Sequence, residues 1–355
     1  MELRPLGDSD LRVSVVGLGV RPDQAGRDGG GQSLRGHVTT LHRHGTAPPI
    51  ACLPMEHTDL GPLRVSRVGL GCNNFGGRLD LAATRRVVDA ALDAGVNLLD
   101  TADIYGNRGG SERLLGELLQ GRRDRVVLAT KFGGEMGEGA VGGAPAYVKQ
   151  ALEASLQRLQ TDHVDLLYHH FPDDATPIAD TVGAMSELVA AGKVRAIGVS
   201  NVTADALAEA AATAEIAAVQ NEYSLLAREA ERDLLPACLE LGVGFVPYFP
   251  LASGFLTGKY RPGEAADGSR LGTVEEGASV TRRASASFAT VERLQRFAEE
   301  QGHSLVELAI AGLASRPGLA SVIAGATKPE QVRANAAAGD WQLTTGQLAA
   351  LDAIA

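Results

Sequence analysis

The chain has 355 residues, of which 33 are Lys or Arg and 43 are Asp or Glu, giving a formal net charge of −10 at pH 7. This acidic balance argues against binding to nucleic acid or to an anionic membrane surface. No apolar run reaches the roughly 18 residues of a membrane span, and the start lacks the order of a signal peptide. Because Cys52, Cys72 and Cys238 lack disulfide or metal-ligand spacing, we expect a soluble protein of the reducing cytoplasm.

The first predicted strand occurs twice. Leu-Arg-Val-Ser-Val-Val-Gly-Leu-Gly ends at Gly19, and Leu-Arg-Val-Ser-Arg-Val-Gly-Leu-Gly ends at Gly71. Repeat architectures need at least three stacked units, so two copies indicate a duplicated beginning. Residues 20–54 contain no aromatic residue and no helical or strand period, whereas an amphipathic helix soon follows Gly71. We therefore interpret residues 1–54 as a disordered or mis-annotated extension with a duplicated hairpin segment, and residues 55–355, from Met55, as the folded domain. The alternative is an N-terminal lid that carries a spare hairpin.

From residue 67 onward the chain alternates short apolar runs with amphipathic stretches. Strands are predicted at residues 68–71, 97–100, 125–130, 164–168, 194–199, 217–220, 244–248 and 321–324. Helices are predicted near residues 81–94, 111–119, 146–159, 178–191, 203–214 and 230–240, followed by a longer insert and a last helix after Lys328. Nearly continuous apolar strands are typical of parallel sheets covered on both faces. The number of βα units and the chain length predict an α/β fold, a (β/α)₈ TIM barrel with an N-terminal hairpin.

A doubly wound open sheet is the structural alternative. Gly69 and Gly71 begin the dinucleotide-binding fingerprint Gly-x-Gly-x-x-Gly, but Asn74 stands where its third glycine belongs. In a barrel the chemistry lies at the C-terminal ends of the strands. Polar or ionisable residues stand at six successive strand ends, although each one alone would be an ordinary surface or core residue. They are Asp100, Lys131, His169 with His170, Ser200 with Asn201, Gln220 and Tyr248.

These strand ends resemble those of the aldo-keto reductase family from Glu56 to about Leu351. The shared motifs are Asp100-Thr-Ala-Asp-Ile-Tyr105-Gly, Leu-Ala-Thr-Lys131-Phe-Gly, His170-Phe-Pro, Gly192-Lys-Val-Arg-Ala-Ile-Gly-Val-Ser200-Asn201, Gln220-Asn-Glu-Tyr, Pro250-Leu-Ala-Ser-Gly-Phe-Leu-Thr-Gly-Lys259 and Ile323-Ala-Gly-Ala-Thr-Lys-Pro-Glu-Gln331-Val-Arg-Ala-Asn335. The resemblance implies NAD(P)H-dependent reduction of a small-molecule aldehyde or ketone, as in carbonyl reductases and alcohol dehydrogenases of this family. It also implies that Asp100, Tyr105, Lys131 and His170 form the catalytic group.

The chemistry of carbonyl reduction independently requires these residue types. Hydride transfer leaves negative charge on the carbonyl oxygen, and a proton donor must meet it. Lys131 can lower the pKa of the Tyr105 phenol, while Asp100 keeps Lys131 charged and aimed. His170 can orient the substrate oxygen. Its neighbour His169 is the rival, but adjacent strand residues point to opposite faces and the family's His-x-Pro spacing selects His170.

The resemblance also predicts a cofactor site, with NADPH or NADP preferred over NADH because Lys328 and Arg333 can pair with a 2′-phosphate. The remaining expected cofactor contacts are Asn73, Asp100, Ser200, Asn201, Gln220, Tyr248, Leu251, Ser253, Gly254, Leu256, Lys259, Gly325, Thr327, Gln331 and Asn335. Glycines allow close approach of backbone to pyrophosphate, and the start of the last helix favours phosphate. A long loop after strand seven, residues 257–286, covers the cofactor in relatives, or is a plain surface loop.

Phe75, Phe171 and Tyr223 are predicted substrate walls, although aromatic residues at such positions also serve packing. Two other functional classes remain open. A cofactor-binding redox sensor or channel-associated subunit would use the same barrel, and a metal-assisted hydrolase would need a metal set that the sequence lacks. We therefore expect no metal, no nucleic-acid or membrane partner, and a monomer or weak oligomer.

Overall fold

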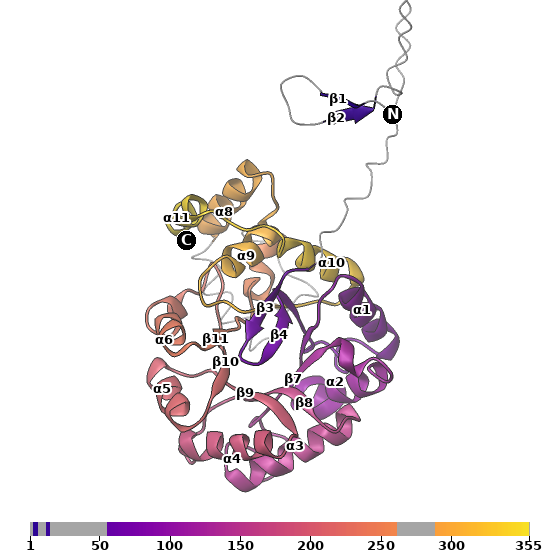
Figure 1. Ribbon diagram of the computed structural model, residues 1–355, viewed down its shortest axis with the longest axis vertical. Coiled ribbons are helices and arrows are strands. Elements are labelled where there is room, and N and C mark those ends of the chain that lie inside the picture. Colours follow the sequence, from indigo (N-terminus) through magenta and orange to yellow (C-terminus); the bar gives the residue numbers. More distant parts are fainter. Residues whose placement is uncertain (1–2, 6–11, 15–54, 261–287, 355) are drawn as a thin grey trace, which may run out of the picture. The chain divides into compact units, whose positions relative to one another are not determined.

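The computed structural model describes residues 3–5, 12–14, 55–260 and 288–354 (Figure 1). It divides into two units, Met1–Ile50 and Ala51–Ala355. In the first unit, β1 (Leu3–Pro5) and β2 (Arg12–Ser14) form an antiparallel pair. In the second, β3 (His57–Leu60) and β4 (Leu63–Ser66) pair in the same way. The duplicated segment therefore forms a hairpin in both copies, whereas the stretch from residue 15 to 54 lies outside the described residues.

Eight parallel strands form the sheet of the second unit, in the order β11-β10-β9-β8-β7-β6-β5-β12. They are β5 (Val68–Gly71), β6 (Leu98–Asp100), β7 (Val127–Phe132), β8 (Val164–His169), β9 (Val194–Ser200), β10 (Ile216–Gln220), β11 (Gly244–Phe245) and β12 (Val322–Gly325). Backbone hydrogen bonds from Ala320 to Phe245 and from Ile323 to Pro247 join the two ends of the sheet. The predicted (β/α)₈ barrel is confirmed.

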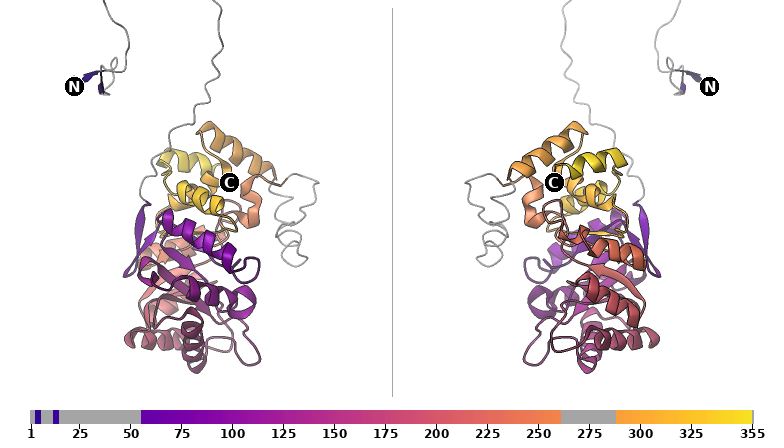
Figure 2. Two further views of the ribbon diagram at one scale, coloured as in Figure 1. Left: turned by 90° about the vertical axis from the view of Figure 1, so that its right-hand side faces the viewer. Right: turned by 90° about the vertical axis from the view of Figure 1, so that its left-hand side faces the viewer.

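Helices surround the barrel (Figures 1 and 2). They are α1 (Leu81–Asp93), α2 (Tyr105–Leu118), α3 (Pro145–Leu159), α4 (Ile178–Ala190), α5 (Ala204–Thr213), α6 (Leu234–Leu241), α8 (Phe288–Glu300), α9 (Leu305–Ala314), α10 (Pro329–Ala338) and α11 (Thr345–Asp352), with 3₁₀ turns η2 (Arg123–Arg125), η3 (Glu229–Glu231) and η4 (Ala252–Thr257). The strands β7, β8 and β10 are buried along their whole length. This agrees with their apolar sequences, since helices cover one face and the barrel interior the other.

The β3–β4 hairpin covers one end of the barrel (Figure 2). Its buried side chains Leu60, Leu63 and Val65 belong to the cluster that fills the barrel interior. At the turn, Gly61 has a φ of 55°, and a Cβ there would lie 2.7 Å from Cβ of Ala217. Both the backbone conformation and this close approach require glycine. The hairpin closes the end opposite to the strand termini where chemistry is expected.

Several predicted boundaries are corrected by the structure. The insert before residue 329 contains α8 and α9, and α10 is not the last helix because α11 follows it. Strand β11 ends at Phe245, not at residue 248, because Pro247 has no N–H group to donate to the ladder; Tyr248 still pairs with Glu222 as an isolated bridge. In α2, residues 106–109 have positive φ angles, so regular helix begins only after them. The predicted long loop after strand seven lies mostly at residues 261–287, outside the described residues.

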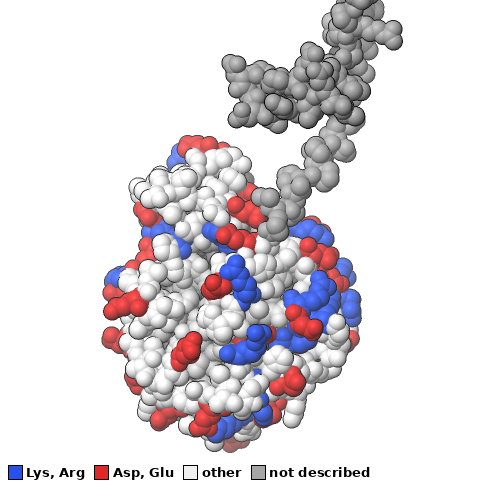
Figure 3. Space-filling view, in the orientation of Figure 1, with Lys and Arg blue, Asp and Glu red and all other residues white. Residues whose placement is uncertain are grey.

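The surface of the described residues carries charges of both signs. On the face that bears the β3–β4 hairpin, acidic side chains are scattered and basic ones gather toward α1 and α2 (Figure 3). Among the described helices, none combines the length and apolar character needed to cross a membrane. The described residues also contain no group of three or more His, Cys, Asp or Glu side chains that could hold a metal ion.

Candidate active site

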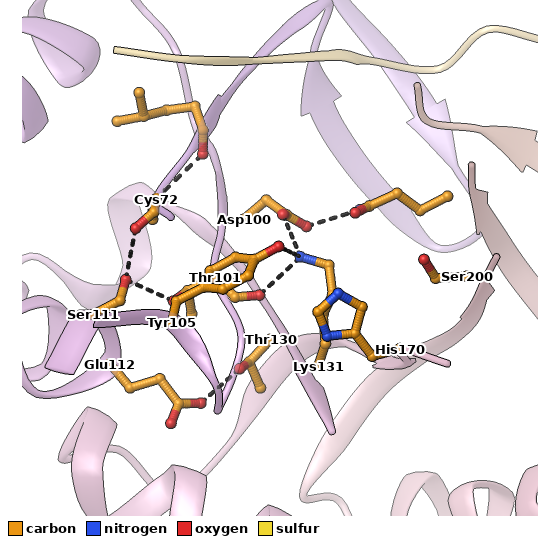
Figure 4. A network of polar contacts seen from close by, with 12 residues as sticks. Cys72, Asp100, Thr101, Tyr105, Ser111, Glu112, Thr130, Lys131, His170 and Ser200 are labelled. Carbon is orange, nitrogen blue, oxygen red and sulfur yellow. Dashed lines mark hydrogen bonds and ion pairs between the residues drawn. The ribbon is translucent and has the colours of Figure 1, made fainter. Parts of the chain in front are cut away.

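Four side chains with acid–base chemistry meet at the C-terminal end of the barrel strands. Asp100 ends β6, Lys131 lies in β7, Tyr105 begins α2, and His170 directly follows β8. The Lys131 ammonium group donates to the Asp100 carboxylate, to the Thr101 carbonyl oxygen at 3.0 Å and to the Tyr105 hydroxyl at 3.5 Å (Figure 4). All three ammonium hydrogens of Lys131 are therefore directed at oxygen atoms.

The ion pair between Lys131 and Asp100 lies in the protein interior. Lys131 is fully buried and Asp100 is 3% exposed. The second carboxylate oxygen of Asp100 accepts a hydrogen bond of 2.9 Å from the Gln220 side-chain amide. A buried charge is tolerated only when its partners replace the lost water, and Asp100 has such a partner on each oxygen. The ion pair is thus fixed between neighbouring strand ends.

Burial and charge act in opposite directions on Lys131 and Tyr105. Burial lowers the pKa of Lys131, but the Asp100 carboxylate and the Tyr105 phenolate outweigh it, and the net pKa is raised. Burial raises the pKa of Tyr105, and the Lys131 ammonium lowers it by less, so that the net pKa lies above its ordinary value. Lys131 acts on Tyr105 in the expected direction, but burial is the larger effect. Both groups are therefore fully protonated at neutral pH.

His170 is held neutral beside this ion pair. Burial, and then the positive charge of Lys131, lower the pKa of His170 to about 2. Its ring lies edge-on to the ring of Tyr105, with 5.9 Å between centroids, and stacks on Phe171 at 4.1 Å. His169 faces the other way and stacks on Phe132 at 5.4 Å, with a pKa lowered by burial to about 4. The predicted packing role of His169 agrees with this position.

Asn201 connects the ends of three strands at the rim. Its amide nitrogen donates to the His170 carbonyl oxygen at 2.9 Å and to the Ser200 hydroxyl at 3.0 Å, and its carbonyl oxygen accepts from the Tyr248 hydroxyl at 2.7 Å. Asn201 has a φ of 58°, and Phe249, Ala252 and Ser253 also have positive φ values. Non-glycine residues adopt this conformation rarely, and clusters of them are typical of functional sites.

A cavity of about 590 Å³ opens above these side chains. The predicted site residues that line it are Asn73, Asp100, Tyr105, His170, Phe171, Asn201, Gln220, Tyr248, Leu251, Ser253, Gly254, Lys259, Gly325, Thr327 and Gln331. A hollow of about 670 Å³ between α2 and α3 contains the Lys193–Glu153 ion pair but none of the four catalytic candidates. We assign the site to the barrel cavity because the acid–base groups lie there.

Other predicted residues lie outside the cavity lining. Lys131 is buried behind the Tyr105 hydroxyl, which it contacts, and Ser200, Leu256 and Asn335 are also buried without lining the cavity. Lys328 and Arg333 are exposed at the start of α10. Lys131 therefore contacts two residues of the cavity lining without lining the cavity itself. The two exposed cations could meet only a ligand group that extends beyond the cavity.

Two of the predicted substrate walls are corrected. Phe75 and Tyr223 are fully buried and do not line the cavity. The Tyr223 hydroxyl donates to Glu231 at 2.6 Å, and its ring packs edge-on against Phe245. Both aromatic side chains belong to the hydrophobic core of the barrel unit. Phe171, by contrast, is 42% exposed and lines it.

The cavity also contains residues that the sequence reasoning missed. The additional lining residues are Gly71, Cys72, Asn74, Arg78, Ile104, Phe249, Pro250, Thr257, Ile323, Ala324 and Ala326. Asn74 and Arg78 follow β5, so the rule that located the other strand-end residues could have found them. Phe249 and Thr257 depend on the irregular backbone after β11, for which the sequence has no comparable periodic signal.

Comparison with known proteins supports the relationship suggested by these motifs. The model of the aldo/keto reductase family matches residues 67–355. The chain is 36% identical over 302 residues to a probable voltage-gated potassium channel subunit beta of Oryza sativa subsp. japonica, covering 81% of this chain and 92% of that protein. A protein of the same description in Arabidopsis thaliana is 35% identical over 302 residues, with the same coverage.

A solved structure is also similar to this chain over most of its length. The aldo-keto reductase AKR11C1 from Bacillus halodurans, in its holo form, matches with a TM-score of 0.72 and 33% sequence identity. The match covers 85% of this chain and 96% of that structure. The family model and the solved structure therefore lead to the same family.

Proposed function

The chain belongs to the aldo/keto reductase family, and from this premise we propose that it reduces aldehydes or ketones to alcohols, with NADPH as the hydride donor. The observation that carries the proposal is the contact between Lys131 and Tyr105 at the base of the cavity. When bound, the cofactor supplies the hydride. The chain must then bind and orient the carbonyl, exclude water and provide one proton.

Tyr105 is the proposed proton donor. Tyr105 lines the cavity. Its phenol is protonated at neutral pH, since its ordinary pKa of about 10 is raised further by burial. As negative charge develops on the substrate oxygen, the phenol releases its proton toward that oxygen, and Lys131 stabilises the phenolate that remains. Neutral His170 can direct one ring N–H at the substrate oxygen without competing for the proton. Phe171, stacked on His170, is the proposed apolar wall for the substrate.

The cavity residues fit a nicotinamide dinucleotide in several respects. Tyr248 presents an aromatic ring, and Gly254 has a φ of 96°, with the Lys259 ammonium 2.9 Å from the point where a Cβ would lie. The aromatic face suits the nicotinamide ring. The glycine lets the backbone come close to the pyrophosphate, and the nearby cation suits a phosphate group. Both amide hydrogens of Asn201 are already donated within the protein, so we propose that Asn201 contributes only its carbonyl oxygen to a ligand.

The start of α10 is the proposed phosphate end of the cofactor site. The Gln331 side-chain carbonyl oxygen accepts from the backbone N–H groups of Thr327, at 2.8 Å, and Lys328, at 3.2 Å. A phosphate could bind these two N–H groups only by displacing Gln331. Lys328 and Arg333 on the same segment support the choice of NADPH over NADH, since neither cation has an ion-pair partner among the described residues.

The experiment that tests this proposal is a panel of aldehydes and ketones with NADPH, followed by the loss of NADPH absorbance. Turnover of at least one carbonyl that is lost in Tyr105→Phe supports it. The second candidate function is a cofactor-binding redox sensor or channel-associated subunit, and the plant relatives, described as probable potassium channel subunits beta, favour the channel-associated role. Tight NADPH binding without turnover of any carbonyl would support that second function. We place either activity in the cytoplasm, in a monomer or weak oligomer.

A further inference from the structure

Asp103 is a buried carboxyl group that the proposed mechanism does not use. It lies two residues before Tyr105, and it is 1% exposed. No side chain of the described residues donates a hydrogen bond to either of its carboxyl oxygens. A buried carboxylate without partners is costly, whereas a buried neutral carboxyl is tolerated far better. The environment of Asp103 therefore favours its protonated form.

The charged groups around Asp103 strengthen this preference. Glu112 of α2, fully buried, accepts from the Thr130 hydroxyl at 2.6 Å and from the Arg158 guanidinium at 2.6 Å. Arg158 of α3 is thereby paired with Glu112, and Lys131 of β7 is paired with Asp100. Both nearby cations thus already neutralise other carboxylates, and Glu112 adds a like charge.

The pKa of Asp103 agrees with this geometry. Burial and then the Glu112 charge raise it to about 7, against smaller opposing effects of the Ile104 N–H group, Arg158 and Lys131. Tyr147, half-buried on α3, is a further titratable group near Asp103, and its own pKa is raised by burial and by the Asp103 charge. The Asp103 carboxyl thus changes charge near neutral pH, far from the ordinary range of aspartate.

The backbone links Asp103 to the catalytic residues on both sides. Its N–H group donates to the Lys131 carbonyl oxygen at 3.0 Å, and the Tyr105 N–H group donates to the Ala102 carbonyl oxygen at 3.2 Å. If the carboxyl ionises, the segment moves toward water or gains a counter-ion, and either response displaces Tyr105 relative to Lys131. The contact at 3.5 Å between these two side chains is the one on which the proton transfer depends.

We propose that Asp103 is a positioning residue that holds the Tyr105 segment in its active arrangement only while its carboxyl is protonated, so that turnover declines as the pH rises above neutral. The inference rests on the proposed function. An asparagine would have the same shape without an ionisable proton and would be cheaper to bury. An aspartate at this position instead makes the segment sensitive to pH.

The test compares the parent protein with Asp103→Asn in kcat measurements from pH 6 to pH 9. In the parent, kcat is expected to fall by about tenfold for each pH unit above a midpoint near 7. Asp103→Asn should change by less than about twofold over the same range. The ionisation of Tyr105 does not account for this decline, since the Tyr105 pKa is raised above its ordinary value.

Asp165→Asn is the matched control, because Asp165 is also buried but is paired with Arg123 and Arg195 away from the cavity. It should keep the parent's decline. An unchanged decline in Asp103→Asn overturns the inference and leaves the proposed function intact. Absence of turnover in the parent at every pH instead overturns the proposed function. Asp103→Ser is the second variant, in case the asparagine is poorly accommodated, and it should also lack the decline.

A stability measurement gives an independent readout. A carboxyl whose pKa is raised on folding contributes its full stabilisation at a pH below its pKa in the unfolded chain, which is about 4 for aspartate. This contribution is lost as the pH rises from there through the pKa in the folded protein, which is about 7. Asp103→Asn should therefore have a higher Tm than the parent at pH 8, and the difference should shrink toward pH 4.5. Asp165→Asn should have a lower Tm at pH 8. A Tm difference for Asp103→Asn that is independent of pH also overturns the inference.

Discussion

Replacing Tyr105 with Phe removes one hydroxyl group and keeps the ring that lies edge-on to His170. The hydroxyl is the proposed proton donor, and its loss also leaves one Lys131 ammonium hydrogen without an oxygen partner. Lys131 cannot take over the role, because it is fully buried and its other two hydrogens are held by Asp100 and Thr101. We therefore expect kcat/KM to fall by about 10²–10⁴-fold, the range typical of a lost general acid.

This loss corresponds to about 2.7–5.4 kcal/mol of transition-state stabilisation. Cofactor affinity should change by less than about threefold, or ~0.65 kcal/mol, because the proposed cofactor contacts at Tyr248, Lys259 and α10 are untouched. Titration of NADPH by fluorescence and steady-state rates on the same samples measure both quantities. If Tyr105→Phe reduces aldehydes as fast as the parent, Tyr105 is not the general acid.

Tyr223→Phe provides the matched control. It removes a hydroxyl from a tyrosine that lies in the core and donates to Glu231 at 2.6 Å. A hydrogen bond to a charged group contributes about 1.5–3 kcal/mol, so this variant should unfold at a lower temperature. Its kcat/KM should stay within about twofold of the parent, well inside the smallest loss expected for a missing acid. A large change of substrate preference in Tyr223→Phe would restore its rejected role as a substrate wall.

Three further predictions follow from the same structure. Replacing both Lys328 and Arg333 with Ala should erase most of the preference for NADPH over NADH. In the parent this preference is expected to be about ten- to hundredfold, since each charge-assisted contact contributes about 1.5–3 kcal/mol. Equal Kd values for the two cofactors in the parent would contradict this assignment. A chain that starts at Met55 should keep the Tm and turnover of the full chain, whereas a large loss of Tm would establish the N-terminal lid. Lys131→Met should lower kcat/KM, measured by NADPH absorbance, about as much as the loss of the Tyr105 hydroxyl does. Asp100→Asn should lower it by the same amount or less. Full activity in either variant would rule out the ion pair as a support for the phenol.

The sequence predicts the barrel and the residues at the C-terminal ends of its strands because both follow from local signals. Continuous apolar runs place the strands, and the residue after each run must lie at the same rim. The helices α8 and α9 were missed although one local signal was present: Ser304 and Glu307 form a capping box at the start of α9. Their apolar residues lie beside an insert without a period, which hid the boundary.

Other features were beyond the reach of sequence reasoning for a physical reason. The side-chain directions of Phe75 and Tyr223 depend on how the chain leaves each strand, and no periodicity reports that geometry. The pKa of Asp103 depends on Glu112 and on the pairing of Arg158, which come near it only through the packing of α2 and α3. A strand-end rule identifies which residues are near the site, but burial and partners decide their protonation.

The protonation states together limit how the site can work. Lys131 and Asp100 form one fixed ion pair, while burial keeps Tyr105, His170 and Asp103 uncharged at slightly acid pH. Any further charge on these groups must therefore be created during the reaction. The Tyr105 phenolate is the charge that the site stabilises best, because it lies beside Lys131. The same phenolate could accept a proton from an alcohol in the reverse direction. Because the same oxygen atom donates the proton in one direction and accepts it in the other, the geometry allows both directions. The ratio of reduced to oxidised cofactor would then set which direction prevails.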